Sequence, residues 1–176
     1  MARGSIKERM EELQAENKSV PEILWAHEIA SGLKYLHDEG IVHGDLRGAN
    51  VLVDHDNHVY IADFGLSFLP DMSRSSGGDT TYHRGASDVY SFGCVCFEIC
   101  NGAPPYAHLR DHQVITVVIT GDATLEWPVI AVGNPAKEEL RSIAARCQRF
   151  KPSVRPDISI VDSELSALLD EQGVAS

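Results

Sequence analysis

The sequence predicts a mainly helical fold that carries one small β-hairpin. Apolar residues recur at helical spacing between Pro21 and Gly40, two residues suited to begin and to end a helix. Two short apolar runs, Val51–Val53 and Val59–Ile61, flank a turn rich in Asp and Asn, which is typical of a hairpin. Residues 88–100 are apolar almost all round, so we expect them to form a buried helix.

Four further segments favour helices, namely residues 5–17, 108–120, 134–150 and 158–170. The first is rich in charged residues and has few apolar ones, and we expect a short solvated helix that docks weakly. Asn134 is the expected cap of the third, and Ser87 is the expected cap of the buried helix. Because the sequence shows no internal repeat and no linker, we predict that residues 1–176 form a single domain.

The composition describes an ordinary globular chain. It has 176 residues, of which 43% are hydrophobic, enough for one sizeable core. Its net charge of −11 would repel nucleic acids and anionic membranes, so we expect neither as a partner and consider protein partners instead. The four cysteines show no zinc spacing and are expected to be small buried side chains in a reducing compartment. Because no leader or membrane-spanning run is visible, we expect a cytoplasmic or nuclear location.

Two polar motifs stand out, one after the first long predicted helix and one after the hairpin. They are His43-Gly44-Asp45-Leu46-Arg47-Gly48-Ala49-Asn50 and Asp63-Phe64-Gly65. Together they supply an acid that can accept a hydroxyl proton, and an amide oxygen and a second acid that can hold Mg²⁺ against phosphates. Either motif alone also fits the ordinary chemistry of caps and turns. Their combination favours phosphoryl transfer.

Three later segments accompany these motifs in order. They are Ser87-Asp88-Val89-Tyr90-Ser91-Phe92-Gly93, Gly102-Ala103-Pro104-Pro105-Tyr106 and Arg155-Pro156. With them the chain resembles the C-terminal lobe of a protein kinase of the tyrosine-kinase-like group. The resemblance implies a mainly α, kinase-like lobe with a catalytic loop at residues 43–50, a magnesium-binding loop at 63–65, a shortened activation segment at 66–86 and the buried helix at 88–100.

The resemblance also implies roles for single residues. It makes Asp45 the acid that accepts or orients the substrate hydroxyl, while Arg47 neutralises the transferred phosphoryl group. Asn50 and Asp63 become the ligands of Mg²⁺, and Leu52 becomes the floor beneath the adenine of ATP. The expected cofactors are therefore ATP and Mg²⁺, and the expected substrate is a Ser, Thr or Tyr hydroxyl of a protein.

Other polar residues are expected to be structural. The resemblance implies that His43 supports the loop and stacks near Phe64, and that Asp88 anchors the backbone of the catalytic loop. The Asp and His residues of the segment 54–58 are interpreted as a solvated turn, in preference to a metal site. The Gly- and Ser-rich residues 72–81 are expected to form a mobile loop.

Several parts that the resemblance requires are missing. The sequence contains no G-x-G-x-x-G lid, no lysine in a V-A-I-K-like strand and no Ala-Pro-Glu segment, so we expect the N-terminal lobe to be absent. Arg155 is then expected to be buried without the glutamate that pairs with it in the family. For these reasons we expect the chain alone to bind Mg-ATP weakly and to have negligible activity.

Other interpretations stay open at this point. The chain is also compatible with a pseudokinase, meaning a non-catalytic module that binds protein partners, and with a truncated product. A small-molecule phosphotransferase similar to aminoglycoside or choline kinases is a further alternative, since Gly44 completes a His-Gly-Asp loop of their type. Those families lack the segments around Asp88 and Arg155, so the sequence favours a protein kinase.

Overall fold

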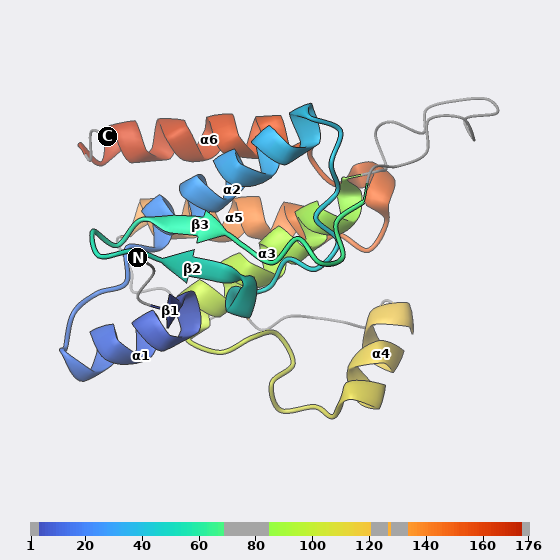
Figure 1. Cartoon of the computed structure of the whole chain (residues 1–176), viewed down its shortest axis with the longest axis horizontal. Helices are drawn as coiled ribbons and strands as arrows, with labels where there is room; N and C mark the ends of the chain where they lie inside the picture. The colour runs from blue at the N-terminus through green and yellow to red at the C-terminus, as the bar shows by residue number, and fades with distance from the viewer. Residues whose placement is uncertain (1–3, 69–84, 121–126, 128–133, 174–176) are drawn as a thin grey trace.

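The computed structural model describes residues 4–68, 85–120, 127 and 134–173. These residues form several helices and one small antiparallel sheet (Figure 1), which confirms the predicted mainly helical fold. In chain order the elements are β1 Gly4–Ser5, α1 Ile6–Ala15, α2 Glu22–Asp38, η1 Gly48–Asn50, β2 Val51–Val53, β3 Val59–Ile61, α3 Ala86–Asn101, α4 Asp111–Thr120, α5 Pro135–Cys147, η3 Pro152–Val154 and α6 Ile158–Glu171, where η1 and η3 are single turns of 3-10 helix. The expected mobile loop at residues 72–81 and most of the expected activation segment at 66–86 lie outside the described residues.

The predicted hairpin is present with the predicted bounds. β2 and β3 pair antiparallel, with Val51 opposite Ile61 and Leu52 opposite Tyr60. β1 adds a third, two-residue strand beside β2, which the sequence pattern did not predict. Val51 and Val53 are fully buried, whereas Leu52 is half-buried, so alternate residues of β2 face the core and the opposite side of the sheet.

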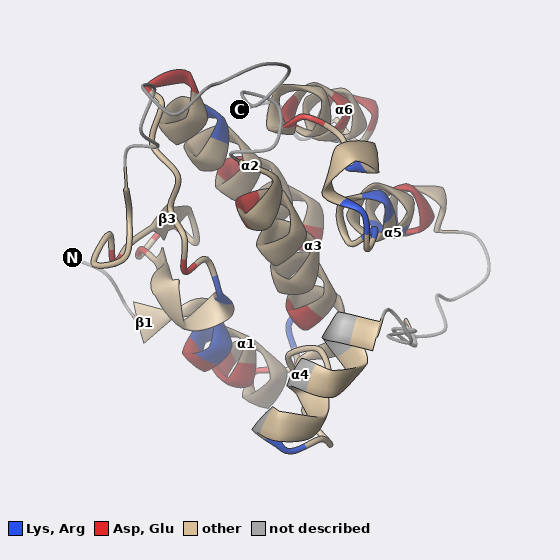
Figure 2. Cartoon of the chain, turned by 90° about the vertical axis from the view of Figure 1, so that its right-hand side faces the viewer, with Lys and Arg blue, Asp and Glu red and all other residues tan. Residues whose placement is uncertain are grey.

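The core is built around α2 and α3. α2 packs against α6 and the hairpin, and α3 packs against α5. In Figure 2, α3 runs through the middle of the molecule, with α1 and the sheet on one side and α5 and α6 on the other. Trp25, Phe92, Leu140 and Leu165, each from a different helix, are fully buried. The prediction of a buried helix at residues 88–100 is therefore confirmed.

α1 docks more firmly than the sequence suggested. Ile6, Met10 and Leu13 lie on one stripe of the helix and are all buried, although half of the residues of the helix are charged. Arg9 is 5% exposed and donates from Nε to Oδ1 of Asn57 in the hairpin turn (2.8 Å). The expectation of weak docking was wrong because three apolar residues at helical spacing are enough to bury one face.

Three helix ends differ from the predicted ones. α3 begins at Ala86 after Gly85, so Ser87 lies inside the helix and is not its cap. α4 begins at Asp111, because the Arg110 carbonyl accepts the first bonds of the helix. α5 ends at Cys147, earlier than predicted, whereas its expected cap at Asn134 is confirmed by a bond from the Lys137 N–H (3.1 Å).

The four cysteines are free thiols in the structure. Cys96 and Cys147 are buried, as predicted, and Cys94 and Cys100 are half-buried. Burial raises the pKa of Cys94 to about 11 and that of Cys147 to about 12, so these thiols stay protonated at neutral pH. No helix within the described ranges has the length and the apolar character needed to cross a membrane.

Candidate active site

The two motifs lie side by side although the hairpin separates them in sequence. α2 ends at Asp38, and Gly40 follows it in the left-handed conformation, with a φ of 74°, which directs the chain away from the helix. Val42 and Phe68 then form an antiparallel bridge through two backbone hydrogen bonds of 3.1 Å. The Ser67 hydroxyl donates to the carbonyl of His43 (3.1 Å). The start of the catalytic loop is therefore bonded to the segment that follows the second motif.

One buried carboxylate holds the start of the catalytic loop. Asp88, in the first turn of α3, is 1% exposed. Its Oδ2 accepts from the backbone N–H of His43 (2.8 Å), and its Oδ1 accepts from that of Gly44 (2.9 Å). His37 Nε2 lies 2.9 Å from Oδ2. Burial by itself would raise the pKa of Asp88, but the hydrogen bonds from His37, Gly44 and His43 outweigh burial and lower it. The anchor that the sequence predicts at Asp88 is thus confirmed.

The side chain of Asn50 is bonded to Asp45 across the catalytic loop. Asn50 is 6% exposed, and its Nδ2 donates to the carbonyl of Asp45 (2.8 Å) and to Oδ2 of Asp45 (3.1 Å). Because the amide nitrogen makes both of these bonds, the amide oxygen Oδ1 is turned away from Asp45. The loop therefore presents a carboxylate and an amide oxygen from neighbouring side chains.

His43 and Asn50 join this pair to the second motif. His43 Nδ1 accepts from the Asp45 N–H (3.2 Å), so the proton is on Nε2, which donates to the Ala62 carbonyl (3.1 Å). The Asn50 carbonyl accepts from the Ala62 N–H (2.8 Å). Asp63 is the next residue. Backbone and ring hydrogen bonds thus bring Asp45, Asn50 and Asp63 into one region of the molecule.

The second motif has a constrained backbone. Asp63 is exposed and adopts a left-handed conformation with a φ of 63°, which residues other than glycine rarely do. Its Oδ1 accepts from the N–H of Gly65 (3.2 Å). The ring of Phe64 lies 5.4 Å from that of His43, which confirms the expected packing of these two residues. The Asp63 side chain is therefore exposed and held by the turn at one of its two carboxylate oxygens.

Arg47 and Leu52 flank these residues. Arg47 is exposed, and its backbone is extended, with a φ of −158° and a ψ of 164°. Leu52 is half-buried on β2, opposite Tyr60, on the face of the hairpin away from Val51. The structure leaves both side chains accessible to a ligand beside the loop, and their roles stay predictions.

Arg155 has partners, contrary to the expectation from the sequence. Its Nε donates to the carbonyl of Arg149 (2.7 Å), and its two terminal nitrogens donate to those of Ala86 (2.7 Å) and Phe150 (3.0 Å). Its guanidinium carbon also lies 4.9 Å from the centre of the Tyr90 ring. Burial lowers the pKa of Arg155. The expectation of an unpaired arginine was wrong because three backbone carbonyls supply the acceptors that a glutamate would have supplied.

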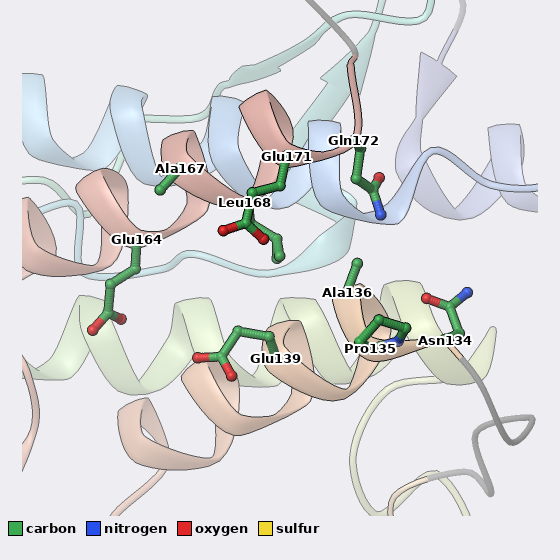
Figure 3. A pocket seen from close by; sticks show the side chains of 9 residues that line it. All are labelled: Asn134, Pro135, Ala136, Glu139, Glu164, Ala167, Leu168, Glu171 and Gln172. Atoms are coloured by element: carbon green, nitrogen blue, oxygen red, sulfur yellow. The ribbon is translucent and has the colours of Figure 1, made fainter.

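A groove of about 680 Å³ lies elsewhere, between α5 and α6 (Figure 3). Apolar side chains such as Leu168 line it together with the carboxylates of Glu139, Glu164 and Glu171. Glu164 is already paired with Arg146. None of the site residues predicted from the sequence lines this groove, so it is separate from the site described above.

A comparison with known families decides what this arrangement is. The family model described as "Protein kinase domain" matches residues 1–164. The chain belongs to the protein kinase family. This result confirms the resemblance that the motifs predicted.

Individual kinases match most of the chain. Mitogen-activated protein kinase kinase kinase 1 of Arabidopsis thaliana is 32% identical over 148 residues, which are 76% of this chain and 23% of that protein. Serine/threonine/tyrosine-protein kinase HT1 of the same plant is 29% identical, over 90% of this chain and 43% of that kinase. Mitogen-activated protein kinase kinase kinase zak-1 of Caenorhabditis elegans is 29% identical, over 86% of this chain and 22% of that kinase. The chain therefore spans less than half the length of each of these kinases.

The residues of this kinase site suit Mg²⁺ that is shared with a phosphate ligand. In the part of the chain that the structure describes, no group of three or more His, Cys, Asp or Glu side chains is arranged to hold a metal by itself. The carboxylate of Asp63 and the amide oxygen of Asn50 are hard oxygen ligands of the kind that Mg²⁺ prefers. Mg²⁺ commonly binds one or two such protein ligands together with substrate phosphates. The donor set therefore fits a Mg-nucleotide better than a resident metal ion.

Sequence reasoning missed two residues that lie beside the catalytic loop or its anchor in this kinase lobe. His37 bonds to Asp88, and the Glu98 carboxylate packs closely against Gly48. A signal for the second existed, because Glu98 is an acidic residue within an otherwise apolar helix. A buried carboxylate needs a hydrogen-bond donor, and the nearest candidates in a lobe of this kind are backbone N–H groups of the loop that packs on the helix.

Proposed function

We propose that this chain provides the catalytic-loop half of a protein kinase site, which transfers the γ-phosphate of Mg-ATP to a Ser, Thr or Tyr hydroxyl of a protein. The observation that carries the proposal is the bonding of Asn50 Nδ2 to Asp45, beside Asp63. In this arrangement the Asp45 carboxylate would accept the proton, and the oxygens of Asn50 and Asp63 would bind the metal ion. Phosphoryl transfer needs this division of tasks.

Each side chain then has a defined task. Asp45 accepts the proton of the substrate hydroxyl, whose oxygen forms a bond to the γ-phosphorus of ATP. The bond between the γ-phosphorus and the β,γ-bridging oxygen breaks at the same time, and ADP leaves. Asn50 Oδ1 and the Asp63 carboxylate would hold Mg²⁺, which neutralises the charge on the phosphates when it is bound. Arg47 adds positive charge near the transferred group, and Leu52 supports the adenine.

We also propose that the chain alone binds Mg-ATP weakly. The 176 residues contain no glycine-rich lid and no V-A-I-K-like lysine, which are the groups that cover and pair the ATP phosphates in this family. Without them Mg-ATP is held from one side only. We therefore expect weak binding, with a dissociation constant on the order of a millimolar.

A second candidate function is that of a non-catalytic module that binds a protein partner. It is favoured by apolar side chains that are exposed beside the site, namely Phe64 (50%), Leu66 (65%) and Phe68 (53%). The free, buried thiols are in keeping with action in a reducing compartment such as the cytoplasm or the nucleus.

A titration with Mg-ATP distinguishes the two functions. We expect Mg-ATP to raise the melting temperature of the chain, and we expect Asp63→Asn to weaken Mg-dependent binding at least about tenfold by removing a ligand carboxylate. Asp56→Asn is the matched control, because it removes an equal charge from an exposed position in the turn of the neighbouring hairpin. A melting temperature that does not respond to Mg-ATP, or equal responses of the wild type and Asp63→Asn, would favour the non-catalytic module.

A further inference from the structure

The groove between α5 and α6 takes no part in the proposed chemistry. α5 packs on α3 and α6 packs on α2, whereas α5 and α6 contact each other much less. The groove between them has a volume of about 680 Å³, which is in the size range of protein sites that hold a ligand. Figure 3 shows that side chains from both helices line it. The groove therefore exists because each of the two helices is held mainly by a different neighbour.

Apolar surface lines the groove and continues beyond it. Small or apolar side chains of the groove are Pro135, Ala136, Ala167 and Leu168. A second hollow of about 230 Å³ adjoins the groove, because Asn134 and Gln172 line both. The apolar side chains of this second hollow are Val20, Pro21, Ile23, Leu24 and Leu169. A ligand that follows the groove can therefore bury an apolar group at its end.

The groove carries an excess of negative charge. Glu139, Glu164 and Glu171 line it. Arg146 is paired with Glu164, and Lys137 of the second hollow is paired with Glu22, so both of these cations already have a carboxylate partner. In the part of the chain that the structure describes, Glu139 and Glu171 are exposed and form no ion pair. The ligand that complements this groove is therefore positively charged.

The length of the groove fits a short peptide segment. The lining residues of α6 extend from Glu164 to Gln172, which is about 12 Å along the helix axis at the rise of an α-helix. An extended chain rises about 3.3 Å per residue, so about four residues cover this distance. The second hollow lies next to Gln172 and takes one further side chain.

We propose that the groove between α5 and α6 docks a basic segment of a partner protein. Lysine or arginine side chains of the segment lie beside Glu139 and Glu171, and an apolar side chain fills the second hollow. A nucleic acid does not suit the groove, because these carboxylates and the net charge of −11 repel its phosphates. The inference does not rest on the proposed function, since the residues proposed for phosphoryl transfer do not line the groove.

The first test measures whether the whole chain binds a basic peptide. The probe is a dye-labelled peptide of the sequence Leu-Lys-Lys-Leu-Lys-Lys, followed by fluorescence anisotropy. We expect a dissociation constant of about 10–100 μM, and we expect binding to weaken as salt screens the charges. The matched peptide has glutamate in place of each lysine and should not bind. Equal binding of the two peptides would overturn the inference.

Removal of the two exposed carboxylates tests where the peptide binds. Glu139→Gln combined with Glu171→Gln should weaken binding of the basic peptide about threefold to tenfold. Glu11→Gln combined with Asp56→Asn is the matched control, because it removes two exposed carboxylates that line neither hollow. Equal effects of the two double variants would show that the charge of the whole chain attracts the peptide, and would overturn the inference.

A cation placed in the groove tests the same site from the opposite direction. Ala167 is exposed in the groove, and Ala167→Lys should weaken binding at least about tenfold by repulsion and by filling space. Ser163→Lys is the matched control, because it adds the same charge at an exposed position of α6 that does not line the groove; its affinity should stay within about twofold of the wild type. Equal affinities of these two variants would contradict docking in the groove. The carboxylate variants decide the question even if Ala167→Lys does not fold.

Nitrogen-15 NMR of the wild-type chain distinguishes the possible occupants. We expect the basic peptide to shift the amide signals of Ala136 and Leu168 first, because these residues line the groove from its two sides. Shifts at these amides that depend on the concentration of the chain, and not on the peptide, would assign the groove to a second copy and would overturn the inference. Mg-ATP plays no part in these measurements, so a failure of Mg-ATP to bind would overturn the proposed function alone.

Discussion

Asp88→Ala is expected to lower the free energy of unfolding by about 3–5 kcal/mol. The change leaves the N–H groups of His43 and Gly44 buried without their acceptor, and it also removes the partner of His37. A domain of this size has a total stability of about 5–15 kcal/mol, so the effect takes up a large part of it. Urea denaturation followed by circular dichroism measures the loss.

Asp162→Ala is the control for this prediction. Asp162 is partly exposed and accepts a hydrogen bond from Ser31 at the contact of α2 with α6, so it holds no loop backbone. We expect its replacement to lower stability by no more than about 1 kcal/mol. Losses of equal size for the two variants would contradict the assignment of Asp88 as the principal anchor of the loop.

The stabilisation from Asp88 should also depend on pH in a defined direction. Because its pKa is lowered in the folded chain, its contribution is fully present above the unfolded value near 3.8 and is lost as the pH falls through the lower native value. The difference in urea midpoint between the wild type and Asp88→Ala should therefore be constant around neutral pH and should shrink only below pH 3.8. A difference that shrinks already at higher pH would contradict the lowered pKa.

The chain alone is expected to transfer no measurable phosphate from Mg-ATP to itself or to a peptide. Removal of one preorganised donor lowers the rate of an enzyme by about 10²- to 10³-fold, and the sequence lacks both the lid and the V-A-I-K-like lysine. Two such losses combine to a deficit of at least about 10⁴-fold. Incorporation of radioactive phosphate into the wild-type chain should equal that into Asp45→Asn, which lacks the proposed proton acceptor.

One result would contradict the expected lack of phosphate transfer. Clear incorporation by the wild type that disappears in Asp63→Asn would mean that the residues present are sufficient for catalysis. Asp56→Asn is again the control, since its carboxylate is exposed on the hairpin turn and has no part in the proposed chemistry.

Regular patterns allowed most of the fold to be predicted. The two strands of the hairpin and the helices over residues 22–38 and 158–171 follow directly from the spacing of apolar residues and from glycine and proline at their ends. The docking of α1 was missed because Ile6, Met10 and Leu13 are few, even though they share one face. The two-residue strand β1 is too short to show any periodicity.

The sequence predicted less of the candidate site than of the fold, because much of the site is held by backbone atoms. Motif spacing predicted Asp45, Asn50 and Asp63 as site residues, because phosphoryl transfer requires side chains of these kinds. It did not identify the backbone groups that bond to the supporting side chains, such as the Ala62 carbonyl at His43 or the carbonyls around Arg155. A hydrogen bond to the backbone leaves no mark on the identity of the residue that provides it, so only the three-dimensional arrangement reveals it.

In the proposed function, Asp45, Asn50 and Asp63 gather around one Mg-nucleotide. The most direct test adds Mn²⁺ and ATP to the nitrogen-15-labelled chain, because the paramagnetic ion broadens the signals of nearby groups. We expect the signals of the side-chain amide of Asn50 and of the backbone amide of Asp63 to broaden first. Broadening confined to the acidic groove of Glu139 and Glu164, with sharp signals at Asn50 and Asp63, would contradict it.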